Sequence, residues 1–117
     1  MRILFFNPPG EDTVPEIQSE EGTTYLDSSD VGAFPPLGLL YVLSYLEENT
    51  TGHEMVFLDC IGEKVSQAEL PNKIREIRPD VIGITSFTIS LVDISRAVKT
   101  MKEIVPNAHI CLGGHHP

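Results

Sequence analysis

The chain has 117 residues, of which 41% are hydrophobic, and its formal net charge is −9. This length is enough to bury the core of one compact domain without disulfides or structural metals. No apolar stretch approaches the ~20 residues of a membrane span, and the apolar N-terminal run ends at Asn7, too early for a secretory signal. We therefore expect a single cytoplasmic domain over residues 1–117, without a membrane partner.

The charge is unevenly distributed along the chain. Residues 3–63 contain twelve acidic residues and no Lys or Arg, whereas residues 64–117 contain seven basic and five acidic residues. Nucleic-acid binding depends on basic side chains that neutralise phosphates, so this balance argues against DNA or RNA as a partner. The acidic half is either a solvated surface or a docking face for a partner or a second domain.

Four short apolar runs alternate with three helical patterns. The runs at residues 3–7, 55–59, 81–86 and 108–113 predict strands, and most are almost continuously apolar, as strands buried on both faces are. This alternation is typical of βαβ units. It predicts an α/β fold in which an open parallel sheet lies between two layers of helices.

The helical patterns cover residues 37–49, part of residues 68–78 and the segment that follows Ser90. Ser90 can cap the third helix, with Asp93 in its first turn. Four residues of the first helix recur at helical spacing and should face the sheet: Leu39, Leu40, Leu43 and Leu46.

Residues 8–36 do not fit the alternation. They form a 29-residue connection with seven acidic residues and little periodicity, whereas strand-to-helix connections in α/β units usually have about 2–6 residues. A long acidic loop after a strand is either a lid over a binding site or a disordered segment. Its position at the carboxyl end of a strand favours the lid.

Ligands of open α/β sheets bind outside the carboxyl ends of the strands. The candidate site residues at those ends are Asn7, Pro8 and Pro9 after the first strand, Ser86, Phe87 and Thr88 after the third, and Gly113, Gly114 and His115 after the fourth. A glycine pair after a strand usually allows a ligand or another backbone to approach closely. His115 and His116 either contact a ligand or are simply exposed.

The chain lacks the sequence motifs of several familiar functions of such a fold. The chain has no acidic cluster for a receiver-domain magnesium, no hydroxyl-rich phosphate loop after the first strand and no G-x-G-x-x-G turn. Cys60 and Cys111 do not have metal-site spacing. In a sheet of order 2-1-3-4 they would lie three strands apart, roughly 14 Å, too far for a disulfide. We expect both thiols in or near the core and predict no metal site.

Five motifs follow one another along the chain: Asn-Pro-Pro at 7–9, Pro-Pro-Leu-Gly-Leu at 35–39, Gly-His-Glu at 52–54, Pro-Asp-Val-Ile-Gly-Ile at 79–84 and Gly-Gly-His-His-Pro at 113–117. Together they resemble the N-terminal cobalamin (B12)-binding domain of B12-dependent radical SAM proteins, including anaerobic magnesium-protoporphyrin IX monomethyl ester oxidative cyclases. The resemblance implies a flavodoxin-like (Rossmann-like) sheet of strand order 2-1-3-4, truncated before a fifth strand.

The resemblance also implies cobalamin over the strand carboxyl ends, with its nucleotide tail beside the sheet. Ser86 and Thr88 would offer hydroxyls to the tail, and Gly113 and Gly114 would leave room for it. Related methyltransferases and mutases ligate cobalt through the histidine of D-x-H-x-x-G after the first strand. Because Pro9 stands at that position, bound cobalamin would lack this ligand.

The C-x-x-x-C-x-x-C motif of radical SAM enzymes does not occur in the chain. The iron–sulfur cluster and S-adenosylmethionine would therefore belong to a downstream radical SAM domain, an implied partner. The leading interpretation is a cobalamin-binding module that is not catalytic alone. The alternative is a flavodoxin-like interaction or scaffold domain without a cofactor. Because residues 110–112 are apolar and uncharged, we also expect self-association through the fourth strand.

Overall fold

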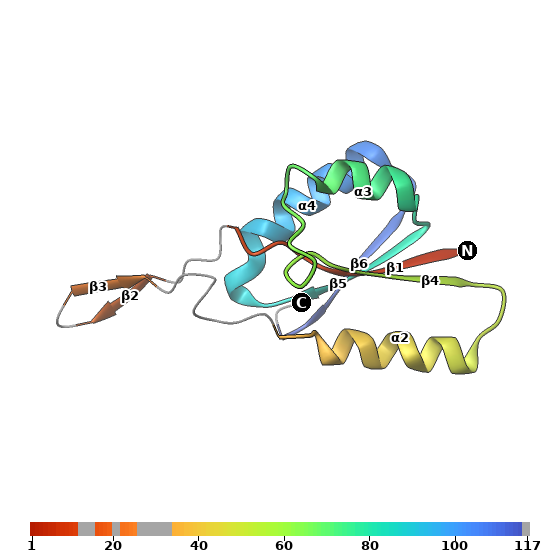
Figure 1. Cartoon of the computed structure of the whole chain (residues 1–117), viewed down its shortest axis with the longest axis horizontal. Coiled ribbons are helices and arrows are strands. Elements are labelled where there is room, and N and C mark those ends of the chain that lie inside the picture. The colour runs from red at the N-terminus through yellow and green to blue at the C-terminus, as the bar shows by residue number, and fades with distance from the viewer. Residues whose placement is uncertain (12–15, 20–21, 26–33, 116–117) are drawn as a thin grey trace.

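A computed structural model describes residues 1–11, 16–19, 22–25 and 34–115. Its central sheet lies between two layers of helices (Figure 1). The helices α3 (Leu70–Ile77) and α4 (Leu91–Ile104) cover one face, and α2 (Leu37–Asn49) lies against the other. This arrangement confirms the three-layer α/β fold predicted from the sequence.

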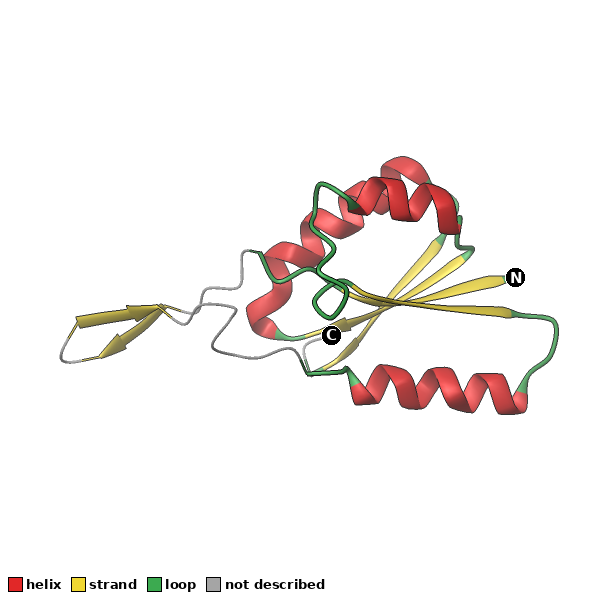
Figure 2. Cartoon of the chain, in the orientation of Figure 1, coloured by secondary structure: helices red, strands yellow, loops and turns green. Residues whose placement is uncertain are grey.

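The sheet has four parallel strands in the order β4-β1-β5-β6. Their bounds are Arg2–Asn7 for β1, Glu54–Asp59 for β4, Val81–Ser86 for β5 and His109–Gly114 for β6. These are the four predicted strands in the predicted order 2-1-3-4. All four run in one direction (Figure 2), so their C-terminal ends share one side of the sheet, here called the carboxyl edge.

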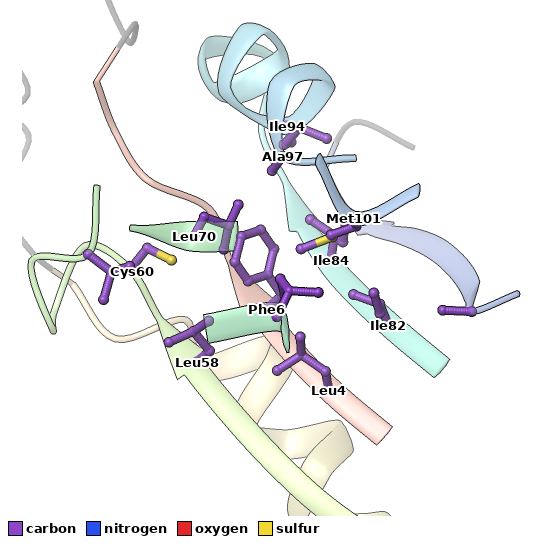
Figure 3. Close-up of a cluster of buried hydrophobic side chains, with 13 residues drawn as sticks. Leu4, Phe6, Leu58, Cys60, Leu70, Ile82, Ile84, Ile94, Ala97 and Met101 are labelled. Carbon is purple, nitrogen blue, oxygen red and sulfur yellow. The ribbon is translucent and has the colours of Figure 1, made fainter. Parts of the chain in front are cut away.

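The hydrophobic core lies between the sheet and the α3–α4 layer (Figure 3). Successive side chains of a strand point to opposite faces. In β1, Leu4 and Phe6 therefore point into this core and are fully buried, while Phe5 points toward α2. In β5, Ile82 and Ile84 occupy the equivalent buried positions.

The face covered by α2 is less well packed. The four leucines expected to face the sheet are the half-buried positions of this helix, so their predicted direction is confirmed, yet α2 has no buried residue. One helix is about 10 Å wide and cannot cover four strands spaced about 4.8 Å apart. On this face α2 packs against β1, and Cys111 of β6 is exposed.

Residues 8–36 contain regular structure that the sequence did not predict. The strands β2 (Glu16–Ser19) and β3 (Gly22–Tyr25) form an antiparallel hairpin that stands apart from the central sheet (Figure 1). Each strand has four residues, too few for a periodic pattern to be recognised. Residues 12–15, 20–21 and 26–33 of the expected loop lie outside the described part.

The first turn of α4 differs from the predicted cap. Ser90 holds the N-cap position but makes no side-chain cap hydrogen bond. Its Oγ instead accepts a hydrogen bond from the Phe87 N–H at 3.1 Å and donates to the Phe87 carbonyl at 2.9 Å. A local serine-to-backbone bond has replaced the expected one.

Among the described residues, no helix is long and apolar enough to cross a membrane.

Candidate functional site

The strands β5 and β6 end in a tightly joined seam at the carboxyl edge. Ser86 is fully buried, and its Oγ donates a hydrogen bond to the Gly113 carbonyl at 2.8 Å. The N–H of His115 donates to the Ser86 carbonyl at 3.1 Å. The structure therefore brings the predicted residues Ser86, Gly113 and His115 together, and it engages the Ser86 hydroxyl within the protein.

Gly114 is required by this seam. Its φ is +100°, and a Cβ there would lie 2.6 Å from the Ser86 carbonyl oxygen and 2.9 Å from its nitrogen. Side chains rarely adopt this backbone conformation, and the neighbouring atoms are backbone that cannot move aside. Gly114 thus allows the end of β6 to approach the backbone of β5. Of the two uses expected for the glycine pair, close approach of a ligand or of another backbone, Gly114 serves the second.

Gly113 has different surroundings. A Cβ at Gly113, or at Gly83 of β5, would meet nothing within 4 Å. Gly83 pairs with Cys111 and Thr85 with Gly113, and all four alternate with residues that face the α3–α4 core. They form a strip on the α2-facing side, the open lane, which leads to the carboxyl edge. The open lane offers space beside the sheet.

Exposed apolar side chains lie near the end of β5. Phe87 and Ile89 are 44% and 41% exposed, and Val92 in the first turn of α4 is 51% exposed. These three residues are here called the apolar platform. Phe87 also meets the ring of His115 edge to face, with ring centroids 5.3 Å apart. Thr88 lies between Phe87 and Ile89 and is exposed.

The other predicted residues tie the loops after β1 and β4 together. The Nδ2 of Asn7 donates to Asp59 Oδ1 at 2.8 Å, and the Cys60 N–H donates to the Asn7 carbonyl at 3.0 Å. Pro8 and Pro9 are buried. Asp59 was not among the predicted site residues, although its place at the end of a strand was a usable signal.

The two cysteines differ in environment. Cys60 is buried, and burial, followed by the nearby carboxylates of Glu63 and Asp59, raises the pKa of its thiol to about 12. Cys111 is exposed, so the expectation of a core or near-core thiol is wrong for this residue. The reason is that β6 is an edge strand whose α2-facing side is uncovered.

The histidines are divided between the two edges of the sheet. His53 precedes β4 and His109 begins β6, both at the amino ends of the strands. His115 follows β6 at the carboxyl edge, and His116 lies outside the described residues. Within the described ranges, no three His, Cys, Asp or Glu side chains gather in a way that could hold a metal ion.

Two hollows of the surface lie elsewhere. One has a volume of about 540 Å³ and is lined by Arg75, Arg78, Glu103, Ile104 and Val105. The other, about 370 Å³, follows one flank of α2 and is lined by Leu37, Leu40, Tyr41, Ser44, Tyr45 and Glu48. The candidate site, formed by the open lane and the apolar platform at the carboxyl edge, shares no residue with either hollow.

Three known proteins align with almost the whole chain. An uncharacterized methyltransferase of Pyrococcus horikoshii is 28% identical over 99% of this chain and 22% of its own length. The anaerobic magnesium-protoporphyrin IX monomethyl ester cyclases of Cereibacter sphaeroides and Rubrivivax gelatinosus are 31% and 27% identical, over 17% and 18% of their lengths. The chain thus spans about a fifth of these relatives.

No solved structure gives a significant match to the chain. A family model does match: that of the B12 binding domain, over residues 26–117. The matched range includes α2, the three later strands of the central sheet and the glycine pair at the end of β6. By this match the chain belongs to the B12-binding domain family.

Proposed function

We propose that this domain binds cobalamin across its carboxyl edge, as a module of a longer radical SAM enzyme. The observation that carries the proposal is the open lane, where Gly83 and Gly113 leave space beside the sheet on the side of α2. Membership of the B12-binding family supports the identity of the ligand. A cofactor with a large ring and a long tail needs both a broad exposed surface and space beside the sheet, which the apolar platform and the open lane would offer.

Each part of the edge would have its own task. The apolar platform would lie against the corrin ring, and the open lane would take the nucleotide tail, with Thr88 exposed beside the platform. Ser86 would act indirectly, since its buried hydroxyl donates a hydrogen bond to the carbonyl of Gly113, a residue of the lane. The cofactor would supply cobalt-centred group-transfer or redox chemistry.

A binding experiment with two glycine variants tests this proposal. We expect the wild-type domain to retain hydroxocobalamin through gel filtration, as seen by its absorbance. Gly113→Val should lower the affinity at least about tenfold, because its side chain extends into the lane, where the Cβ meets no protein atom within 4 Å. Gly38→Ala, a change at a glycine of α2 whose Cβ would also meet nothing within 4 Å, is the matched control.

Two results of this experiment would contradict different parts of the proposal. A colourless wild-type domain after cobalamin loading would favour the alternative function, a scaffold or interaction domain without a cofactor. Unchanged affinity in Gly113→Val would contradict the open lane as the tail site but leave cobalamin binding in place. In both cases a matching urea midpoint for the variant and wild-type proteins shows that the fold is intact.

Cobalt coordination is the second part of the proposal. Pro9 is buried at the position where the methyltransferases and mutases that the chain resembles carry their histidine ligand, so the loop after β1 should provide no imidazole. Electron paramagnetic resonance of the reduced cobalt(II) form should show no nitrogen splitting that depends on a protein histidine. Splitting that is lost in His115→Ala would contradict this and assign the ligand to the loop after β6.

The activity of the longer protein follows from its relatives only as a proposal. Their names indicate methyl transfer in one case and cyclase chemistry on magnesium-protoporphyrin IX monomethyl ester in the others. We propose that a downstream domain holds an iron–sulfur cluster and S-adenosylmethionine. Reconstitution of the parent polypeptide should add iron–sulfur absorbance that this domain alone lacks, and its failure to do so would contradict the radical SAM assignment.

A further inference from the structure

Three segments of the carboxyl edge meet at Gln67, in the loop between β4 and α3. Its backbone N–H donates a hydrogen bond to Glu11 Oε1 at 2.9 Å. Its side-chain Nε2 donates to the carbonyl and to Oδ1 of Asp93, at 3.0 and 3.3 Å. Glu11 follows β1, and Asp93 lies in the first turn of the helix after β5. One residue therefore joins the segments that leave three neighbouring strands.

Asp93 makes this junction more than a surface contact. Its side chain is fully buried, and a buried carboxylate is stable only when hydrogen-bond donors surround it. The first turn of α4 is a favourable place for its negative charge. The carboxamide of Gln67 adds a neutral donor that reaches both the backbone and the side chain of Asp93 from another loop.

The loop that carries Gln67 is itself held in place. The Ser66 N–H donates to Glu69 Oε2 at 2.9 Å, and the Glu69 N–H donates to Ser66 Oγ at 3.2 Å. This reciprocal pair is the capping-box arrangement. The hydrogen bonds from Ser66 also lower the pKa of the Glu69 carboxyl, so this acceptor is ionised at neutral pH. Gln67 lies between its two members.

We infer that Gln67 is a positioning residue, which holds the loops after β1 and β4 and the start of α4 in one arrangement before a ligand arrives. The residue next to Asp93 is Val92, a member of the apolar platform, so the junction fixes the backbone from which the platform extends. The part of this inference that concerns cobalamin rests on the proposed function. The part that concerns the arrangement of the two loops and the start of α4, here called the mechanical part, does not rest on it.

Hydrogen exchange of the domain without ligand tests the mechanical part. Gln67→Met keeps the length of the side chain and removes its donors, and Asn72→Met removes an exposed carboxamide on α3 as the matched control. We expect the backbone amides at positions 65 and 67 to exchange about tenfold faster in the first variant alone. The core amides of Phe6 and Ile84 should keep their wild-type rates.

Two results would overturn the mechanical part. Wild-type exchange at positions 65 and 67 in Gln67→Met shows that the junction restrains nothing. Equal acceleration of the core amides shows a general loss of stability instead of positioning. If Gln67→Met does not fold, Glu11→Ala provides the second variant, since it removes only the acceptor of the Gln67 N–H, and it should accelerate exchange at Gln67.

Stopped-flow binding of hydroxocobalamin tests the ligand part. With a preformed edge, Gln67→Met should lower the association rate about three- to tenfold, because part of the population is not competent to bind, and Asn72→Met should not change it. An unchanged association rate would overturn the positioning role. If the wild-type domain fails to bind, the proposed function is wrong, while the exchange comparison still decides whether Gln67 joins the loops.

Discussion

Gly113 and Gly114 are adjacent in the chain, yet the structure gives them opposite requirements. Gly114 has positive φ and contacts the Ser86 backbone, whereas Gly113 borders open space. Gly114→Ala should therefore lower the free energy of unfolding by about 1–3 kcal/mol, and Gly113→Ala should change it by less than about 0.5 kcal/mol. Urea denaturation monitored by circular dichroism measures both. Equal effects would show that the seam tolerates a side chain.

The two cysteines should differ in reactivity because only the exposed thiol can meet a reagent. At about pH 8, iodoacetamide should label Cys111 of the folded domain and leave Cys60 unlabelled. Both should react in denaturant. Mass spectrometry of the peptides gives the ratio directly, and rapid native labelling of Cys60 would show that the loop after β4 opens far more than its hydrogen bonds indicate.

The buried Cys60 also predicts a dependence of stability on pH. Its pKa rises from 9.0 to about 12 on folding, so between these values the folded state binds more protons than the unfolded state. The free energy of unfolding should then fall as pH rises above about 9, by at most about 1.4 kcal/mol per pH unit. Cys60→Ala should show a smaller decline between about pH 8 and pH 10.5, and equal slopes would contradict the assignment.

At the residue scale the sequence predicts where the site residues lie better than what they do. The positions of Ser86 and Gly113 follow from strand ends and topology, which local patterns reveal. The hydrogen-bond partner of the Ser86 hydroxyl cannot be predicted in this way, because the partner depends on how closely β5 and β6 approach at their last residues. Gln67 was missed because its partners Glu11 and Asp93 are distant in sequence.

Among the described α-helices, α2 is the one without a buried residue. Its sheet-facing leucines are half-buried, whereas α3 buries Leu70 and Ile74 completely. Leu43→Ala should cost less than about 1.5 kcal/mol of unfolding free energy, and Ile74→Ala about 2–5 kcal/mol. Chemical denaturation of both variants makes the comparison, and similar losses would mean that α2 is as well packed as α3.

The elements themselves were largely predictable. Helix α2 has the predicted bounds, and each strand of the central sheet begins within one residue of its predicted start, because almost continuously apolar runs and prolines mark these segments clearly. The hairpin was missed, since each of its strands has four residues and neither pairs with the central sheet in the described part of the chain. Ser90 was placed correctly as the N-cap, but the competition from the Phe87 backbone is invisible in a local pattern.

The whole molecule is asymmetric in how its sheet is covered. Among the described residues, one face is closed by α3 and α4 and holds the main cluster of buried hydrophobic residues, and the other carries α2 and the open lane. This asymmetry was not predicted, because the sequence gives the number of helices but not the width that each one covers. It has two consequences: space for a ligand beside the sheet, and an exposed strip along β6.

The strand β6 has a single strand neighbour among the described residues, and most of its residues are exposed. It has no Lys, Pro or bulge of the kind that protects sheet edges. We predict that the domain self-associates through this edge with increasing concentration. Sedimentation velocity over a hundredfold concentration range measures it, and a monomer throughout would contradict the prediction.

A variant that tests self-association through β6 should change an exposed side chain, so that the substitution does not also weaken the core. Ile110 packs against the core, so a charge there would also weaken the fold. Leu112 is 44% exposed on the same strand, and Leu112→Lys places a charge at the edge with less effect on the core. It should lower the association constant at least about tenfold. Val42→Lys, on the exposed side of α2, is the matched control, and an equal loss in both variants would indicate nonspecific hydrophobic association rather than pairing along β6.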